Sequence, residues 1–378
     1  MRFINKRSIP QLSCLFLSVL MFSCTSSEKQ YVESSKKEIS IDKIDSLLLQ
    51  KKEKPSIVLD HFYNEISMFI AGLPIDTSSR FYKMSSSSEY ENYAKTIDRK
   101  FSKFKSRKLS PLRTWRDSSL LSINNSTENV LYPFSGPDII YAYSIFPTAK
   151  NYYLFGLEPT GIIPNIEDYK TDLLPEFFST LSSSIRDNLS LSFFITKKMK
   201  TQLNNSEIKG TIPILLFFMS RLNLHIQDIK PVYLDSNGLI VSNDEINKKT
   251  TKRIFKTGVD ISFVRPNEDI VSHVYYFSMN INNRGLDDYS PLNLFLNSLT
   301  NKTSTLVKSA SFCMHEKKYS RIKNILLNVS DAIIQDDSGI PYKFFDLDIW
   351  NINLYGSYSQ PISVFKNYLQ RDYKDAFR

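Results

Sequence analysis

Cysteine is scarce in this sequence, which has three cysteines in 378 residues. Cys14 lies in a segment that we expect to be removed and Cys24 directly follows it, so Cys313 is the one cysteine left for the folded part. A disulfide framework is therefore excluded from the mature chain, and an ordinary hydrophobic core must hold the fold. The hydrophobic content of 42% is enough for one large domain or two of moderate size.

Metal-ligand spacings and nucleic-acid-binding modules are also missing. No set of His, Cys, Asp and Glu residues has the spacing of a metal site, so we predict no metal and no other cofactor. The net charge is +9, but the basic residues are scattered, with short runs at 103–108 and 248–253. Because neither a basic stripe nor a recognisable module is present, nucleic acid is not a predicted partner.

The N-terminus has the parts of an export signal. Arg2, Lys6 and Arg7 precede an apolar segment from Leu12 to Phe22, which is too short to span a bilayer comfortably. The sequence Leu20-Met21-Phe22-Ser23-Cys24 resembles the lipobox of bacterial lipoprotein precursors. The resemblance implies removal of residues 1–23 and acylation of Cys24. An ordinary secretory signal and an uncleaved anchor are the alternatives.

Acylation of Cys24 would place the protein on a membrane without crossing it. Two or more inserted acyl chains hold a protein stably, since each buried methylene contributes about 0.8 kcal/mol. Residues 24–38 are rich in Ser, Lys and Glu without apolar periodicity, so we interpret them as a flexible tether. The predicted location is an exported, membrane-anchored one, facing the periplasm or the cell surface.

Residues 39–120 have helical periodicity. A capping-box pattern at Ser86-Ser87-Ser88-Glu89 opens the clearest helix. Its apolar residues recur at steps of three and four and predict one buried face, made of Tyr90, Tyr93, Ile97, Phe101 and Phe104. We interpret 39–120 as a helical N-terminal layer that packs on the rest of the folded chain.

Short apolar runs alternate with helical patterns over residues 121–378, without an internal repeat. Helices are predicted over 172–185, 211–222, 290–299, 319–329 and 361–377, and strands over 189–195, 225–234, 259–264, 271–281, 332–335 and 350–355. This interleaving predicts an α/β fold, a Rossmann-like layered domain with a mixed sheet.

Residues 129–164 are the best candidate for a functional site. An apolar run ends at Ser135-Gly136-Pro137-Asp138, and a second ends at Gly156-Leu157-Glu158-Pro159, which predicts strand, turn, helix and strand. The spacing of 22 residues between Gly136 and Glu158 resembles the first half of a Rossmann dinucleotide or methyltransferase unit. One glycine stands where that fingerprint has three, and Pro137 removes a donor N–H. We therefore keep the topology and reject the cofactor.

Ser135 also stands at a strand-to-helix turn, where the nucleophile of a hydrolase becomes exposed. The motif G-x-S-x-G is absent. A base would come from His225, His273 or His315, of which His315 has the most polar surroundings, with Asp336 or Asp337 to orient it. Ser135 and Asp138 are equally explained as a helix cap and a first-turn acid.

A second polar cluster, Asp336-Asp337-Ser338-Gly339, could hold a cation or a sugar hydroxyl, or form a turn whose carboxylates bond the local backbone. The motifs YPFSGPD (132–138) and GLEP (156–159), with SASF (309–312) and QDDSGIPY (335–342), resemble segments of a group of bacterial proteins without assigned activity. The resemblance spans most of residues 115–378 and directs attention to Ser135, Asp138, Glu158, Asp336 and Asp337. The function stays open between two classes. The first is a binding or assembly component of the cell envelope with a glycan or protein partner. The alternative is a hydrolase of envelope glycans or esters with Ser135 as nucleophile, for which Ser135, His315 and Asp336 are the candidate catalytic residues.

Overall fold

The computed structural model describes residues 2–6, 61–164, 166, 174–191, 210–242, 258–299, 301–308, 310–358, 360–371 and 373. These residues belong to one compact unit, formed by Met1–Arg7 together with Leu59–Arg378. Cys24 and the tether predicted at 24–38 lie outside the described residues. The same holds for residues 39–60 of the predicted helical layer and for residues 7–23 of the predicted signal peptide.

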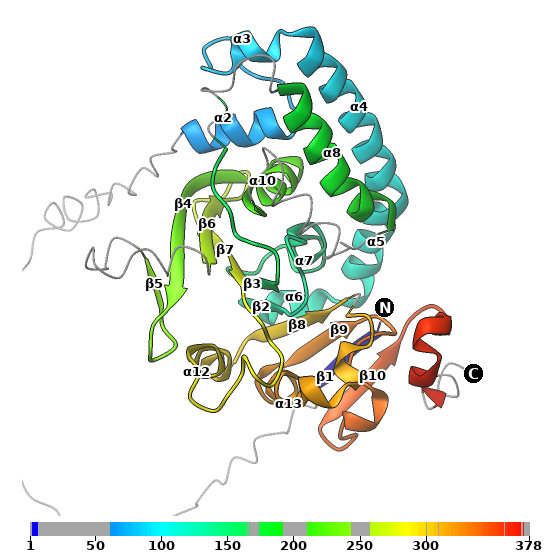
Figure 1. Cartoon of the computed structure of the whole chain (residues 1–378). Helices are drawn as coiled ribbons and strands as arrows, with labels where there is room; N and C mark the ends of the chain where they lie inside the picture. The colour runs from blue at the N-terminus through cyan, green and yellow to red at the C-terminus, as the bar shows by residue number, and fades with distance from the viewer. Residues whose placement is uncertain are drawn as a thin grey trace, which may run out of the picture. The chain divides into compact units, whose positions relative to one another are not determined.

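A ten-stranded mixed sheet organises the described residues, in the order β10-β1-β9-β8-β2-β3-β7-β6-β4-β5 (Figure 1). The five neighbours from β9 to β7 run parallel, and antiparallel strands extend the sheet on both sides. The strands are β1 (Arg2–Lys6), β2 (Asn129–Tyr132), β3 (Asn151–Gly156), β4 (His225–Leu234), β5 (Ile240–Ser242), β6 (Gly258–Val264), β7 (Val271–Ser278), β8 (Thr303–Val307), β9 (Ala332–Gln335) and β10 (Trp350–Leu354). The α/β class with a mixed sheet is confirmed.

The central strands are apolar on both faces because each face supports a core of its own. Successive residues of β3 alternate between the two cores: Tyr152 and Leu154 belong to one, and Tyr153 and Phe155 to the other. Helices α7 (Ile139–Ile145) and α10 (Ile212–Arg221) cover the first face. Helices α12 (Pro291–Ser298) and α13 (Ser320–Val329) cover the second (Figure 1).

The helices before β2 pack on the first core. They are α2 (His61–Ile70), α3 (Tyr82–Ser85), α4 (Ser88–Phe104), α5 (Ser110–Ser119) and α6 (Leu121–Ser126), with a π-helical turn, η1 (Lys105–Leu109), between α4 and α5. Ser87 caps α4 by accepting a hydrogen bond from the Tyr90 amide. All five residues predicted to form the buried face of this helix are buried, so that prediction is confirmed.

Helix α8 (Leu174–Leu191) corrects one prediction. We predicted a strand over 189–195, but residues 189–191 form the last turn of α8, and residues 192–195 lie outside the described part. The amphipathic stripe of Leu174, Phe177, Phe178, Leu181 and Ile185 prolongs the helix past the short alternating pattern that suggested a strand. In the helix predicted over 361–377, the structure has a 3₁₀-helix, η8 (Ser363–Tyr368).

The most N-terminal strand was not expected. Arg2–Lys6, part of the predicted signal peptide, forms β1, which pairs antiparallel with β9 and with β10. The Ile4 side chain is fully buried in the second core. Lys6 donates to the Asn328 carbonyl, and its ammonium lies 5.6 Å from the centre of the Trp350 ring. No described helix is long and apolar enough to cross a bilayer.

Candidate functional site

The carboxyl ends of the parallel strands lie along one edge of the sheet. Strand β3 lies on one side of β2, whereas β8 lies on the other side, although it comes much later in the chain. The chain therefore changes direction within the sheet between β2 and β8. In open α/β sheets, ligands bind outside the carboxyl ends of the strands near such a switch point.

The predicted order of strand, turn, helix and strand over 129–156 is confirmed by β2, α7 and β3. The turn after β2 contains two residues in the left-handed region, Phe134 with φ of 58° and Gly136 with φ of 54°. A bulky residue there costs about 1–2 kcal/mol, so the surroundings must hold Phe134 in place. The Phe134 ring packs edge-on against Tyr319, with ring centres 5.3 Å apart.

Neither polar side chain of this turn caps α7, although the sequence allowed that explanation for both. Ser135 is buried, and its hydroxyl donates to the Phe155 carbonyl at 3.2 Å. Asp138 occupies the N-cap position without a side-chain capping bond. Its Oδ2 accepts hydrogen bonds from the Tyr132 hydroxyl at 2.8 Å and from Lys308 Nζ at 3.2 Å.

The Asp138–Lys308 pair fills the switch point. Lys308 follows β8, and its ammonium also lies 3.9 Å from the centre of the Tyr141 ring. The Asp138 and Lys308 side chains are only 2% and 6% exposed, so each helps to neutralise a charge that is buried away from water. Burial, with the Asp138 charge as the next contribution, raises the pKa of Tyr132 well above its ordinary value. Lys308 was not identified from the sequence.

Glu158 ends the loop after β3 as a buried carboxylate, 1% exposed. Its Oε2 accepts from the Leu157 amide at 3.1 Å and from the Tyr276 hydroxyl at 3.3 Å. Its Oε1 is buried and has no hydrogen-bond partner among the described residues. Burial, followed by the Glu158 charge, raises the pKa of Tyr276 well above its ordinary value, so this hydroxyl stays a donor. Glu158 therefore has one oxygen that is hydrogen-bonded and one buried oxygen that has no partner among the described residues.

Gly156 makes room for this carboxylate. A Cβ on Gly156 would lie 2.5 Å from Glu158 Oε2, 2.6 Å from the Tyr276 hydroxyl and 3.0 Å from Gly136 Cα. Side chains cannot approach so closely, so the contact between the ends of β2 and β3 requires glycine at position 156.

A pocket of about 80 Å³ opens beside Glu158, over the carboxyl ends of β2, β3 and β7. Its lining combines the polar groups of Glu158 and Asn280 with apolar and aromatic side chains. The lining residues are Phe134, Gly136, Phe155, Gly156, Leu157, Glu158, Met279, Asn280, Ile281 and Tyr319. Of the five residues predicted to bind a ligand, Glu158 is the one in this lining. Ser135 and Asp138 lie nearby in the turn after β2, with their side chains bonded elsewhere.

Asp336 and Asp337 follow β9, two strands from β2. Asp336 Oδ1 accepts from the Ser338 amide at 2.9 Å and the Ser338 hydroxyl at 2.7 Å, which is the local turn that we gave as the alternative explanation. The backbone carbonyl of Asp337 accepts from Gln370 Nε2 at 3.2 Å. Neither aspartate lines the Glu158 pocket.

The three candidate histidines have other partners than Ser135. His273 Nδ1 lies 2.9 Å from Asp260 Oδ1, at the start of β7, where it pairs with the first residue of β3. His225 begins β4 at an exposed position. His315 packs on Phe312 and Tyr368. Within the described part of the chain, none of the three hydrogen-bonds with Ser135, so no contact supports a Ser-His pair.

No protein-family model, curated protein or solved structure matches the chain. Among the described residues, no group of three or more His, Cys, Asp or Glu side chains could hold a metal ion. The inference of function therefore depends on the geometry of the site.

Proposed function

We propose that the protein is an exported, lipid-anchored binding component of the cell envelope, and that Glu158 binds a hydrogen-bond donor of its ligand. One observation carries the proposal: the buried oxygen Glu158 Oε1 has no partner among the described residues and belongs to a residue that lines a pocket. A buried polar atom without a partner costs about 1–3 kcal/mol. A ligand that supplies the missing donor would recover that free energy.

The size and chemistry of the pocket define the group that fits. A volume of about 80 Å³ accepts an ammonium or hydroxyl group with one or two carbon atoms, but not a whole sugar or nucleotide. The carboxylate favours an ammonium over a neutral donor, since hydrogen bonds between charged groups are the stronger ones. An envelope glycan, rich in hydroxyl and amino groups, is the partner we favour over a protein.

We further propose that the sheet and its helices form a Rossmann-like domain with α2 to α6 as a helical N-terminal layer. Five adjacent parallel strands, helices on both faces and a switch point beside β2 support this comparison. It implies binding at the carboxyl edge of the sheet. The hydrolase alternative has no supporting contact, because the Ser135 hydroxyl is bonded to a backbone carbonyl.

Glu158→Gln is expected to weaken binding of glucosamine by about tenfold or more, since a hydrogen bond to a charged group contributes about 1.5–3 kcal/mol. The measurement is an NMR titration with glucosamine, and glucose serves as the neutral comparison. Without ligand, the variant is expected to be at least as stable as the parent, because it buries an amide in place of a carboxylate.

The matched control is Glu176→Gln, which removes an exposed carboxylate from α8. It should leave both binding and stability unchanged. Equal glucosamine binding by Glu158→Gln and the parent would refute the assignment of Glu158, and a large loss of stability without ligand would show a structural role instead.

Lipid attachment has a separate test. Cells given a clickable fatty acid are expected to label the parent protein and not Cys24→Ala, because the acyl chains are bonded to the Cys24 sulfur and N-terminus in the proposed mature form. Labelling should depend on Cys24 and not on the other thiol, so Cys313→Ala is the control. Equal labelling of Cys24→Ala and the parent would overturn the lipid anchor.

A further inference from the structure

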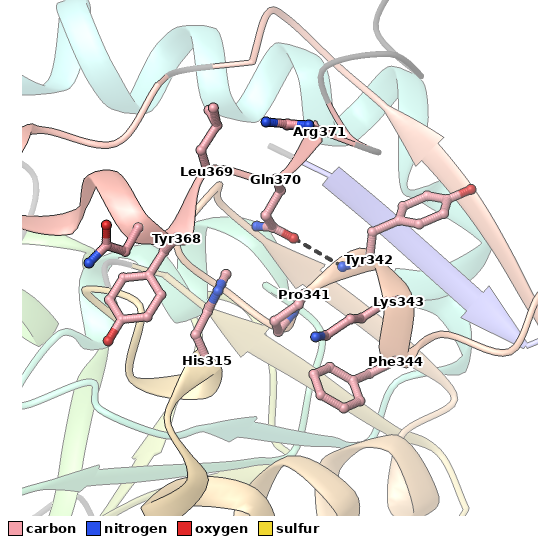
Figure 2. A pocket seen from close by; sticks show the side chains of 10 residues that line it. His315, Pro341, Tyr342, Lys343, Phe344, Tyr368, Leu369, Gln370 and Arg371 are labelled. Atoms are coloured by element: carbon pink, nitrogen blue, oxygen red, sulfur yellow. Dashed lines mark hydrogen bonds between the residues drawn. The ribbon is translucent and has the colours of Figure 1, made fainter.

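A second cavity, of about 370 Å³, shares no lining residue with the Glu158 pocket. Three segments line it: the 3₁₀-helix η5 (Cys313–His315), the turn that includes η7 (Tyr342–Phe344), and residues 367–371, which are the last two residues of η8 and the three that follow it. Figure 2 shows side chains from all three around one space. The lining residues are His315, Pro341, Tyr342, Lys343, Phe344, Asn367, Tyr368, Leu369, Gln370 and Arg371.

This lining carries positive charge and no carboxylate. Lys343 and Arg371 line the cavity, and neither forms an ion pair with any residue that the structure describes. A third cation, Lys323 of α13, is buried beside the lining, with its ammonium 3.3 Å from the centre of the Phe344 ring. The nearby carboxylate of Glu316 accepts a hydrogen bond from the Tyr368 hydroxyl.

The cations of this cluster act on one another. Burial, opposed by a hydrogen bond with the Gly339 backbone and assisted by the charges of Lys323 and Lys343, lowers the pKa of His315 to about 4. Burial and the Lys343 charge also lower the pKa of Lys323. Like charges held together in a partly buried place store repulsion, which a bound anion would relieve.

One polar atom of the lining residues also lacks a hydrogen-bond partner among the described residues. His315 Nε2 is buried and has no hydrogen-bond partner among the described residues. Gln370, in contrast, is fully used, since its Oε1 accepts from the Tyr342 amide at 3.0 Å (Figure 2) and its Nε2 donates to the Asp337 carbonyl. Gln370 therefore holds two segments of the cavity wall together. The side chains left to bind a ligand are Lys343, Arg371 and His315.

We propose that this cavity is a binding site for a small organic phosphate, with the phosphate held by Lys343 and Arg371 and the organic part lying against Tyr368 and Phe344. A guanidinium binds two phosphate oxygens at once, and an ammonium adds a compact charge. The volume exceeds that of phosphate alone, and the aromatic rings suit the carbon face of a sugar or glycerol. The phosphate belongs either to a free metabolite or to a lipid headgroup.

Calorimetric titration of the full chain with inorganic phosphate, glycerol 3-phosphate and dihexanoyl phosphatidylglycerol tests the site. Saturable binding of either organic phosphate is expected, tighter than that of inorganic phosphate. Tighter binding of glycerol 3-phosphate identifies a free metabolite, and tighter binding of the lipid identifies a headgroup. Phosphate binding should also raise the pKa of His315 in an NMR titration, because it neutralises the nearby cations.

The variant Lys343→Gln/Arg371→Gln should weaken organic phosphate binding by about a hundredfold, if each charged contact contributes about tenfold. Lys366→Gln is the matched control, because this exposed lysine lies in η8 next to the cavity and is absent from its lining. Equal binding by the double variant and Lys366→Gln, or no saturable binding of any of the three probes, would overturn the proposal. Circular dichroism verifies that the variants are folded.

Discussion

Replacing Lys308 with methionine is expected to lower the free energy of unfolding by about 3–5 kcal/mol. The substitution keeps the length of the side chain but removes the ammonium that lies 3.2 Å from the Asp138 carboxylate, which is 2% exposed. Removal of one partner from a buried ion pair is that costly because an uncompensated charge stays buried. Urea unfolding of the two proteins, followed by circular dichroism, measures the difference.

The chain offers a matched control for this effect. Lys95 Nζ lies 3.2 Å from Glu91 Oε2, the same distance as Lys308 Nζ from Asp138 Oδ2, but these side chains are 75% and 56% exposed. Lys95→Met should therefore change stability by no more than about 1 kcal/mol. Adding Asp138→Asn to Lys308→Met should recover part of the loss, since the second substitution removes the buried negative charge as well. Equal costs for the two lysine variants would contradict the buried pair.

The local parts of the fold were predictable because burial imposes a simple pattern. Strands β2 and β3 are buried on both faces, which requires an uninterrupted apolar run between turn residues. One face of α4 is buried, which requires apolar residues at steps of three and four. The turns after β2 and β3 could be located because Gly136 and Gly156 interrupt these runs.

The polar contacts at the carboxyl edge of the sheet were predictable only in part, because the order of the strands brings together segments that are distant in the sequence. Glu158 could be found because a carboxylate follows an apolar run, but Tyr276, its hydroxyl partner, is 118 residues away. Lys308 and Asp138 are separated by 170 positions, and nothing near Asp138 in the sequence indicates a cation. Pairs of this kind depend on the position of β7 beside β3 and of β8 beside β2.

The surroundings of His315 also could not be predicted from its neighbours in the sequence. Its polar neighbours in the sequence made it a candidate base for Ser135, but the segment around Tyr368 folds back over it, and the two rings pack at 5.2 Å. The polar side chains near a residue in the sequence are therefore a weak guide to the groups that surround it in the fold. Here they suggested Ser135 as the partner, whereas in the described part of the chain the Ser135 hydroxyl donates to the Phe155 carbonyl.

The Asp138–Lys308 pair at the switch point explains why we place the binding site beside Glu158. A buried Asp138–Lys308 pair takes up the place between β2 and β8 where open α/β sheets hold ligands, and the Glu158 pocket lies one strand further, over β2, β3 and β7. The pair fixes the turn after β2, which also contributes Phe134 and Gly136 to the pocket. A loss of Lys308 should therefore disturb the pocket wall as well as overall stability.

A chain that begins at Cys24 is expected to hold β10 much less firmly than the full-length chain. Within the described part of the chain, strand β10 joins the sheet through β1 alone, so removal of residues 1–23 takes away its hydrogen-bonded neighbour and exposes the edge of β9. Loss of the fully buried Ile4 side chain alone should cost about 1.5–3 kcal/mol. Hydrogen exchange of the peptide 350–354, compared between the two chains, measures the effect.

A chain that has lost residues 1–23 by export processing cannot form β1. The N-terminal residue of the protein in cells therefore decides between the lipid anchor and the strand. Intact-mass analysis of the membrane fraction is expected to find a chain beginning at acylated Cys24, and that chain should show fast exchange over 350–354 and ordinary slow exchange over the central strand β3. A chain that retains residues 2–6 with β10 protected would contradict the lipid anchor. A processed chain with β10 still protected would instead contradict the dependence of β10 on β1, because another segment would then have to pair with it.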